Sequence, residues 1–199
     1  ATVQETVDFI VNLLDDAAAC PDLPWVLPEG EQDNWYGRVT KASAMGLKVR
    51  VLLFAASPLF NDTKPYYPGE ASDKHLTWYG DCQDSRWQAV VDAALAFFKT
   101  MKSQGYYRLV EKGDTQKGTS RAAFRDAYYK RGTTETLIAS FRDIRTANQN
   151  SLLVQSIRWG GFGPTKECFD MFPMADGTEF SWDNEEQAKN PFANRDPRL

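Results

Sequence analysis

The stretch that decides the fold is TKASAMGLKVRVLLFAASP, residues 40–58. Its apolar residues recur at the spacing of one helix face: Ala42, Met45, Val49, Leu52, Leu53 and Ala56. Small residues among them would let a neighbouring helix approach closely. Thr40 is a suitable N-cap, and Pro58 stops the helix because the residue before a proline is pushed out of the α region. The pattern predicts a helix packed on other helices.

Four further segments predict helices by the same spacing: residues 2–19, 85–104, 120–130 and 165–172. Thr2-x-x-Glu5 and Ser85-x-x-Gln88 have the form of capping boxes, and Gly105 is placed to end the third helix. We expect Trp87, Val91 and Phe98 among the inward-facing side chains of 85–104, and Phe124 and Tyr128 among those of 120–130. The first two helices form an antiparallel pair in this prediction. Residues 136–142 are the best strand candidate because apolar and polar side chains alternate there.

The composition is that of a globular protein with one core. The chain has 199 residues, 25% of them charged, and a net charge of −4, which argues against nucleic acid as a partner. No apolar run approaches the roughly 18 residues of a membrane-spanning helix. Aromatic residues are plentiful in polar segments, which suits binding of flat sugar rings, although single aromatic residues at a surface are common. Cys20, Cys82 and Cys168 fit no metal-ligand spacing; both a Cys20–Cys82 disulfide and free buried thiols agree with them.

No catalytic constellation stands out in the sequence. His75 is the single histidine and has no acid or nucleophile arranged around it. Gly160-Gly161-x-Gly163 lacks the context of a phosphate-binding loop, and Asp73, Asp81 and Asp84 do not follow the EF-hand pattern. We therefore predict that the protein is not an enzyme and that it uses no cofactor and no metal.

Several segments resemble the SusD/RagB family of nutrient-binding surface lipoproteins of Bacteroidetes. They occur in the family's order across nearly the whole chain and include RVLLFAASPLFN at 50–61 and the closing Asn-Arg-Asp-Pro-Arg-Leu at 194–199, which is the most specific. The remaining segments are residues 7–10, 15–17, 37–49, 87–94, 105–109, 134–138, 164–165, 169–172 and 176–177.

The resemblance implies a mainly α fold, in which TPR-like antiparallel helix pairs build an α-α superhelix with long irregular loops and one short strand pair. It makes residues 1–199 a fragment of a single SusD-like domain, with a helical scaffold at about 1–132 and a loop-rich ligand side at about 133–199. The implied function is non-catalytic binding of glycans, starch-like or other, for delivery to a SusC-like TonB-dependent transporter. The parent protein would be lipid-anchored at the cell surface of the outer membrane, with the anchor outside this chain. Arg195, Asp196 and Arg198 would be structural.

Ligand residues do not follow from the resemblance and are predicted from chemistry. Trp159 is followed directly by Gly160 and Gly161, and Trp78 and Tyr79 are adjacent in the long polar loop 59–84. Asn148 and Asn150, beside Gln149, could supply hydrogen bonds. A core position for Trp159 explains that residue equally well.

Three alternatives remain open at this point. The chain could be a TPR-type scaffold that binds protein partners, a peptide-binding member of the same family, or a carbohydrate-active enzyme. The scaffold requires regular repeats and a concave groove. The enzyme requires a pair of carboxylates across an aromatic cleft.

Overall fold

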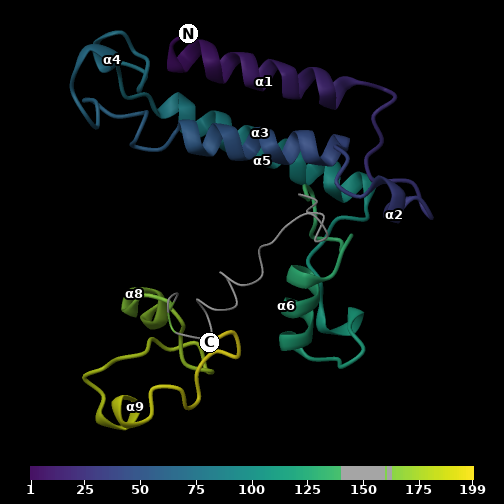
Figure 1. Ribbon diagram of the computed structural model, residues 1–199, viewed down its shortest axis with the longest axis vertical. Coiled ribbons are helices and arrows are strands. Elements are labelled where there is room, and N and C mark those ends of the chain that lie inside the picture. Colours follow the sequence, from purple (N-terminus) through teal and green to yellow (C-terminus); the bar gives the residue numbers. More distant parts are fainter. Residues whose placement is uncertain (140–159, 161–162) are drawn as a thin grey trace. The chain divides into compact units, whose positions relative to one another are not determined.

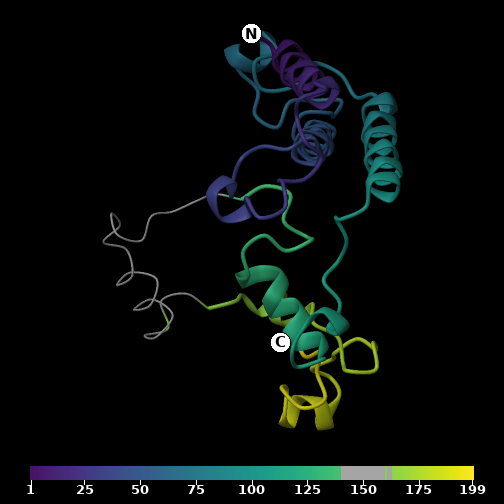
Figure 2. The same ribbon diagram turned by 90° about the vertical axis from the view of Figure 1, so that its right-hand side faces the viewer.

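The computed structural model describes residues 1–139, 160 and 163–199, and the chain is mainly helical, as predicted (Figures 1 and 2). The chain divides into two compact units. The first holds Ala1–Leu109 with Arg131–Ser140, and the second holds Val110–Lys130 with Phe141–Leu199. Residues 110–130, which we expected in the scaffold part, thus group with the C-terminal residues. Among the described residues, no helix has the length and apolar content that crossing a membrane requires.

Three long helices build the first unit: α1 (Val3–Ala19), α3 (Lys41–Ala55) and α5 (Asp84–Gln104). Helix α3 contacts both of the others, and in Figure 1 it lies below α1 and in front of α5. Two of the helix starts follow the predicted caps. The Thr2 hydroxyl accepts from the Glu5 amide, and the Thr40 hydroxyl accepts from the Ser43 amide. Two short helices, α2 (Gln32–Trp35) and α4 (Glu70–Asp73), lie in the connections.

The core of the first unit forms where α3 and α5 meet. Ala42, Phe97 and Tyr107 are its buried members, and Trp25, Met45 and other partly buried residues pack around them. Ala42, Ala44, Ala55 and Ala56 are buried, so small side chains do allow close helix approach. Leu53, which we assigned to the buried stripe, is exposed. The reason is that α3 contacts helices on two sides, so its buried surface follows the small residues rather than one apolar stripe.

Helix α5 corrects two predictions. It begins at Asp84 after Gln83, and Ser85 is not the cap, because its hydroxyl donates to the Gln83 side chain. Trp87, Val91 and Phe98 are exposed rather than inward. Gly105 ends the helix as predicted, with φ of 71°, a conformation that glycine adopts readily.

The predicted strand at 136–142 is absent over residues 136–139, which form an irregular bend. The Ser43 hydroxyl of α3 donates to the Leu137 carbonyl at 2.5 Å, and the Leu137 side chain packs against the core. These tertiary contacts replace the ladder that a strand would need. Phe141 and Arg142 lie outside the described residues. In the part of the chain that is described, the one β-type pairing is an isolated antiparallel bridge between Met174 and Arg195.

The second unit contains two described segments. In the first, η1 (Lys112–Asp114) contacts α6 (Ser120–Tyr129), whose start is capped by the Thr119 hydroxyl. Phe124 and Tyr128 are exposed, contrary to the prediction, and Ala123 is the buried residue of α6. The exposed rings of Phe124 and Tyr128 lie near each other, with centroids 5.7 Å apart, while α6 contacts η1.

The second segment carries α8 (Lys166–Asp170) and α9 (Glu185–Lys189). Its centre is the buried Arg195 guanidinium, which lies over the rings of Phe169 and Phe180. This guanidinium donates to the carbonyl oxygens of Phe169, Phe172 and Pro191, at 2.9, 2.7 and 2.9 Å. Asp196 and Arg198 pair with each other. The predicted structural role of Arg195 is confirmed.

Candidate functional site

Two of the five predicted ligand residues lie in the described part of the chain. Trp159, Asn148 and Asn150 lie outside the described residues, and so does Gln149. Trp78 is half-buried, and its indole N–H donates to the Ser72 carbonyl at 2.9 Å. Its ring centre lies 6.2 Å from that of His75. The polar atom of Trp78 is therefore used within its own loop.

Tyr79 is fixed between the loop and α5. Its backbone N–H donates to the Phe60 carbonyl at 3.0 Å, and the Arg86 guanidinium lies 3.8 Å from its ring centroid. Burial raises the pKa of the Tyr79 hydroxyl above its ordinary value. One face of the Tyr79 ring is thus covered by the Arg86 guanidinium, and both residues line the same groove.

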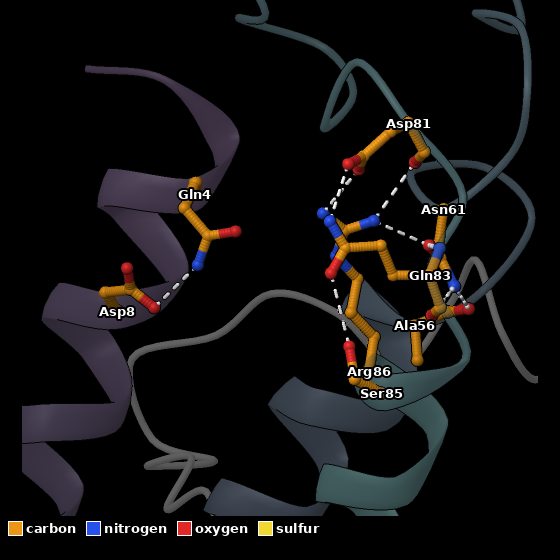
Figure 3. Close-up of polar contacts among 8 residues, drawn as sticks. All are labelled: Gln4, Asp8, Ala56, Asn61, Asp81, Gln83, Ser85 and Arg86. Carbon is orange, nitrogen blue, oxygen red and sulfur yellow. Dashed lines mark hydrogen bonds and ion pairs between the residues drawn. The ribbon is translucent and has the colours of Figure 1, made fainter.

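That arrangement is a groove of about 250 Å³, here called the helix-end groove, where the first turns of α1 and α5 meet the end of α3. Val7, Val11, Leu52, Ala55, Ala56 and Ala89 give it an apolar lining. Its polar lining consists of Gln4, Asp8, Tyr79, Gln83, Ser85 and Arg86. Figure 3 shows Gln4 and Asp8 on α1 across from Arg86 and Gln83. An apolar lining with a few fixed polar groups is typical of small-molecule sites.

The Arg86 side of the groove is held rigidly. The guanidinium donates at 2.7 Å to the side-chain oxygens of both Asn61 and Asp81, and at 3.0 Å to the Asp81 carbonyl. Asn61 is buried and also donates to the Gln83 carbonyl at 3.0 Å. Hydrogen bonds from Gln83 and Arg86 lower the pKa of Asp81. This network ties the loop after α3 to the start of α5, so the Arg86 guanidinium is positioned before any ligand arrives.

The α1 side of the groove is more open. The Gln4 side-chain amide donates to one carboxylate oxygen of Asp8 at 2.8 Å, and both residues are exposed. Within the described structure, the second Asp8 oxygen accepts no hydrogen bond. Carboxylate and amide oxygens accept hydrogen bonds from hydroxyl groups. The groove therefore offers acceptors on one wall, and an aromatic ring with a guanidinium on the other.

Sequence reasoning found Tyr79 but missed Gln4, Asp8 and Arg86. Gln4 and Asp8 are four residues apart on the polar side of α1, a spacing that places them together on a helix surface. Their sequence gave no sign that α5 would lie opposite. Arg86 carries no sequence signal for its position, because its partners Asn61 and Asp81 belong to a loop whose path is set by tertiary contacts.

A second hollow of about 380 Å³ lies in the connection between α1 and α3. It is lined by Leu23, Pro24, Leu27, Pro28, Glu31, Trp35, Arg38 and Val39. The Arg38 guanidinium lies 3.5 Å from the Trp35 ring centroid and covers that face. Because this lining is mostly apolar, it suits a hydroxyl-rich ligand less well than the helix-end groove.

The described structure contains no candidate metal-binding group and no disulfide. No group of three His, Cys, Asp or Glu side chains gathers there in a way that could hold a metal ion. Cys20, Cys82 and Cys168 are free thiols. All three are exposed, so the buried position expected for unpaired cysteines is wrong. The His75 ring lies against Gly80, where a β-carbon would approach the imidazole to 2.2 Å. His75 thus helps to close its own loop.

No protein-family model matches this chain, and no curated protein matches it.

Proposed function

We propose that this chain is part of a non-catalytic cell-surface protein that binds glycans and passes them to a SusC-like TonB-dependent transporter. The parent protein is held at the outer membrane by a lipid anchor, and its ligand is a starch-like or other oligosaccharide. Support comes from the ordered resemblance to the SusD/RagB family, from the antiparallel helices α1, α3 and α5, and from the long loop that reaches Tyr79.

The observation that carries the proposal is the make-up of the helix-end groove. A sugar presents hydroxyl groups at its rim and C–H groups on its ring faces. The groove pairs an apolar lining with the Asp8 carboxylate, the Gln4 amide and a fixed Arg86 guanidinium. The polar groups can hydrogen-bond to the sugar hydroxyls, and the apolar lining can contact the ring faces. The rigid Arg86 network lowers the entropy cost of ordering side chains on binding.

The test is binding of the chain to a panel of neutral polysaccharides, by affinity electrophoresis and calorimetry. Gln4→Ala/Asp8→Ala should weaken binding about fivefold to tenfold, the effect of losing one or two hydrogen bonds. Asn12→Ala/Asp16→Ala is the matched control, because it removes one amide and one carboxylate four residues apart on the same helix. Both doubles should keep the wild-type helical circular dichroism.

Three results would contradict the proposal: no polysaccharide bound by the wild type, equal losses in the two double variants, or shortening of the glycan during incubation. The last would mean an enzyme and is checked by size chromatography. Binding of peptides in place of glycans at the same groove would favour a peptide-binding relative.

A protein-interaction scaffold of the TPR type is the second candidate. It is favoured by the outer side of α5, where Trp87, Val91, Leu95 and Phe98 follow helical spacing and are all exposed. Exposed apolar stripes of this kind mark protein contacts. Loss of a protein partner on Leu95→Lys, with glycan binding unchanged, would assign this surface to the scaffold role.

A further inference from the structure

A basic surface of the described chain lies in the second unit, on α6 and the loop before it. A hollow of about 750 Å³, here called the α6 groove, is formed by residues 115–130 alone. Lys117, Arg121, Arg125 and Lys130 line it, and Asp126 is its only lining carboxylate. This local excess of cations belongs to a chain whose net charge is −4. The α6 groove is therefore positively charged, although the chain as a whole is negatively charged.

The cations of the α6 groove are largely unused. Lys130 pairs with Asp126 at 3.7 Å. Lys117, Arg121 and Arg125 are exposed, and no described carboxylate pairs with them. Arg121 and Arg125 are four residues apart, so they share one side of α6, roughly 6 Å apart along its axis. Lys117, Arg121 and Arg125 form no ion pair in the described structure, so they are available to an anionic ligand.

Aromatic rings lie among these cations. Tyr129 lines the groove four residues beyond Arg125, and Tyr128 stands beside it with ring centres 6.0 Å apart. Helical spacing places Arg121 and Arg125 between Tyr129 on one side and Phe124 on the other. A helix that binds a membrane surface would instead keep its cations and its apolar rings on opposite faces. Thr115, Gln116 and Thr119 add neutral hydrogen-bonding groups.

We propose that the α6 groove binds acidic oligosaccharides, in which sugar rings carry carboxylate groups. The cations receive the carboxylates, and the exposed tyrosine rings with Thr115 and Gln116 receive the sugar rings and their hydroxyls. A volume of about 750 Å³ fits a short oligosaccharide, whereas nucleic acid calls for a longer basic surface. The proposal takes the sugar class from the proposed function, but its site is separate from the helix-end groove.

The test measures binding of the whole chain to oligogalacturonate by calorimetry at low and moderate salt. Arg121→Gln/Arg125→Gln should weaken binding about tenfold or more, because charge-assisted hydrogen bonds are lost. Lys99→Gln/Lys102→Gln removes the same charge from exposed positions on α5 and should leave the affinity unchanged. Added salt should weaken binding by the wild type, since exposed charges are screened.

Three further probes decide between ligand classes. Methyl-esterified oligogalacturonate keeps the sugar rings and loses the charge, so it should bind at least about tenfold more weakly. Single-stranded oligothymidylate of equal charge and vesicles containing phosphatidylglycerol should bind more weakly than the uronate. Tighter binding of either, equal binding of the ester, or equal losses in the two double variants would overturn the proposal.

The two proposals fail separately. Gln4→Ala/Asp8→Ala should leave uronate binding intact, and Arg121→Gln/Arg125→Gln should leave neutral-glycan binding intact. If no neutral glycan binds but uronate binding depends on Arg121 and Arg125, the helix-end groove is refuted and the α6 groove stands.

Discussion

At the scale of single residues, Arg195 is a buried cation whose guanidinium donates to three main-chain carbonyl oxygens. Its hydrogen bonds connect residues 169–172 with residues 191–195, two segments that do not belong to the same helix. Its Nε is buried without an acceptor in the described structure, so the carbonyl contacts and the flanking rings of Phe169 and Phe180 are what hold it.

Arg195→Lys should destabilise this segment by about 2–4 kcal/mol, because an ammonium group cannot reach three separate carbonyls or stack on two rings. Trp182 reports on the same cluster, since its ring centre lies 5.9 Å from that of Phe169. The measurement is urea unfolding followed by the indole resonance of Trp182. Arg198→Lys, at an exposed ion pair, should change stability by less than about 0.5 kcal/mol. Similar losses for both variants would remove the special role of Arg195.

Asp196 gives a prediction about pH. Hydrogen bonds from the Arg198 side chain and backbone lower its pKa from 3.8 to about 2. Because the folded pKa lies below the unfolded value, the pair stabilises the fold above about pH 4. That contribution is lost as the pH falls through about 2. A carboxyl-carbon NMR titration should find the low pKa in wild type and a higher one in Arg198→Gln. An unchanged pKa in the variant would show that Arg198 is not the cause.

At the scale of an element, α5 has two apolar sides, one buried and one exposed, which contribute differently to the free energy of unfolding. Phe97 is 9% exposed and packs with Trp25 and Tyr107, whereas its neighbour Phe98 is 55% exposed. Adjacent residues on a helix point about 100° apart, so two identical phenylalanine side chains lie in different environments.

Phe97→Ala should cost about 3–5 kcal/mol of unfolding free energy, as for a large core side chain. Phe98→Ala should cost less than about 1 kcal/mol, as for a surface position. Chemical denaturation of the two variants, which have the same composition, measures the difference directly. Equal costs would show that a partner or another segment covers the Phe98 side.

At the scale of the whole molecule, the described residues form two compact units, each with its own centre. The first is held by Ala42, Phe97 and Tyr107, and the second contains the cluster around Arg195. In the described structure, the core cluster around Phe97 and the carbonyls and rings that hold the Arg195 guanidinium consist of different residues.

The effects of Phe97→Ala and Arg195→Lys should therefore add. A double-mutant cycle on unfolding free energies should give a coupling energy below about 0.5 kcal/mol, as for sites without shared partners. The four proteins of the cycle are compared by chemical denaturation under one set of conditions. A coupling above about 1 kcal/mol would mean that the two units stabilise each other.

The sequence by itself determined the mainly helical class and most helix limits. The caps at Thr2 and Thr40, and the helix end at Gly105, were predicted from the residue pattern because these interactions span only a few residues. Tyr79 was also predicted as a ligand residue, and the structure places it in the wall of a groove. The ligand itself remains a prediction.

The tertiary structure alone decided the features that depend on distant residues. Residues 136–139 form a bend rather than a strand, and the Leu137 carbonyl there accepts from the Ser43 hydroxyl, 94 positions earlier. The start of α5 is fixed by Asn61, which accepts from the Gln83 amide, and not by a local capping box. Gln4, Asp8 and Arg86 meet at one groove because three helices bring their ends together. Local patterns record interactions within a helical turn, whereas the site is made by contacts between segments far apart in the chain.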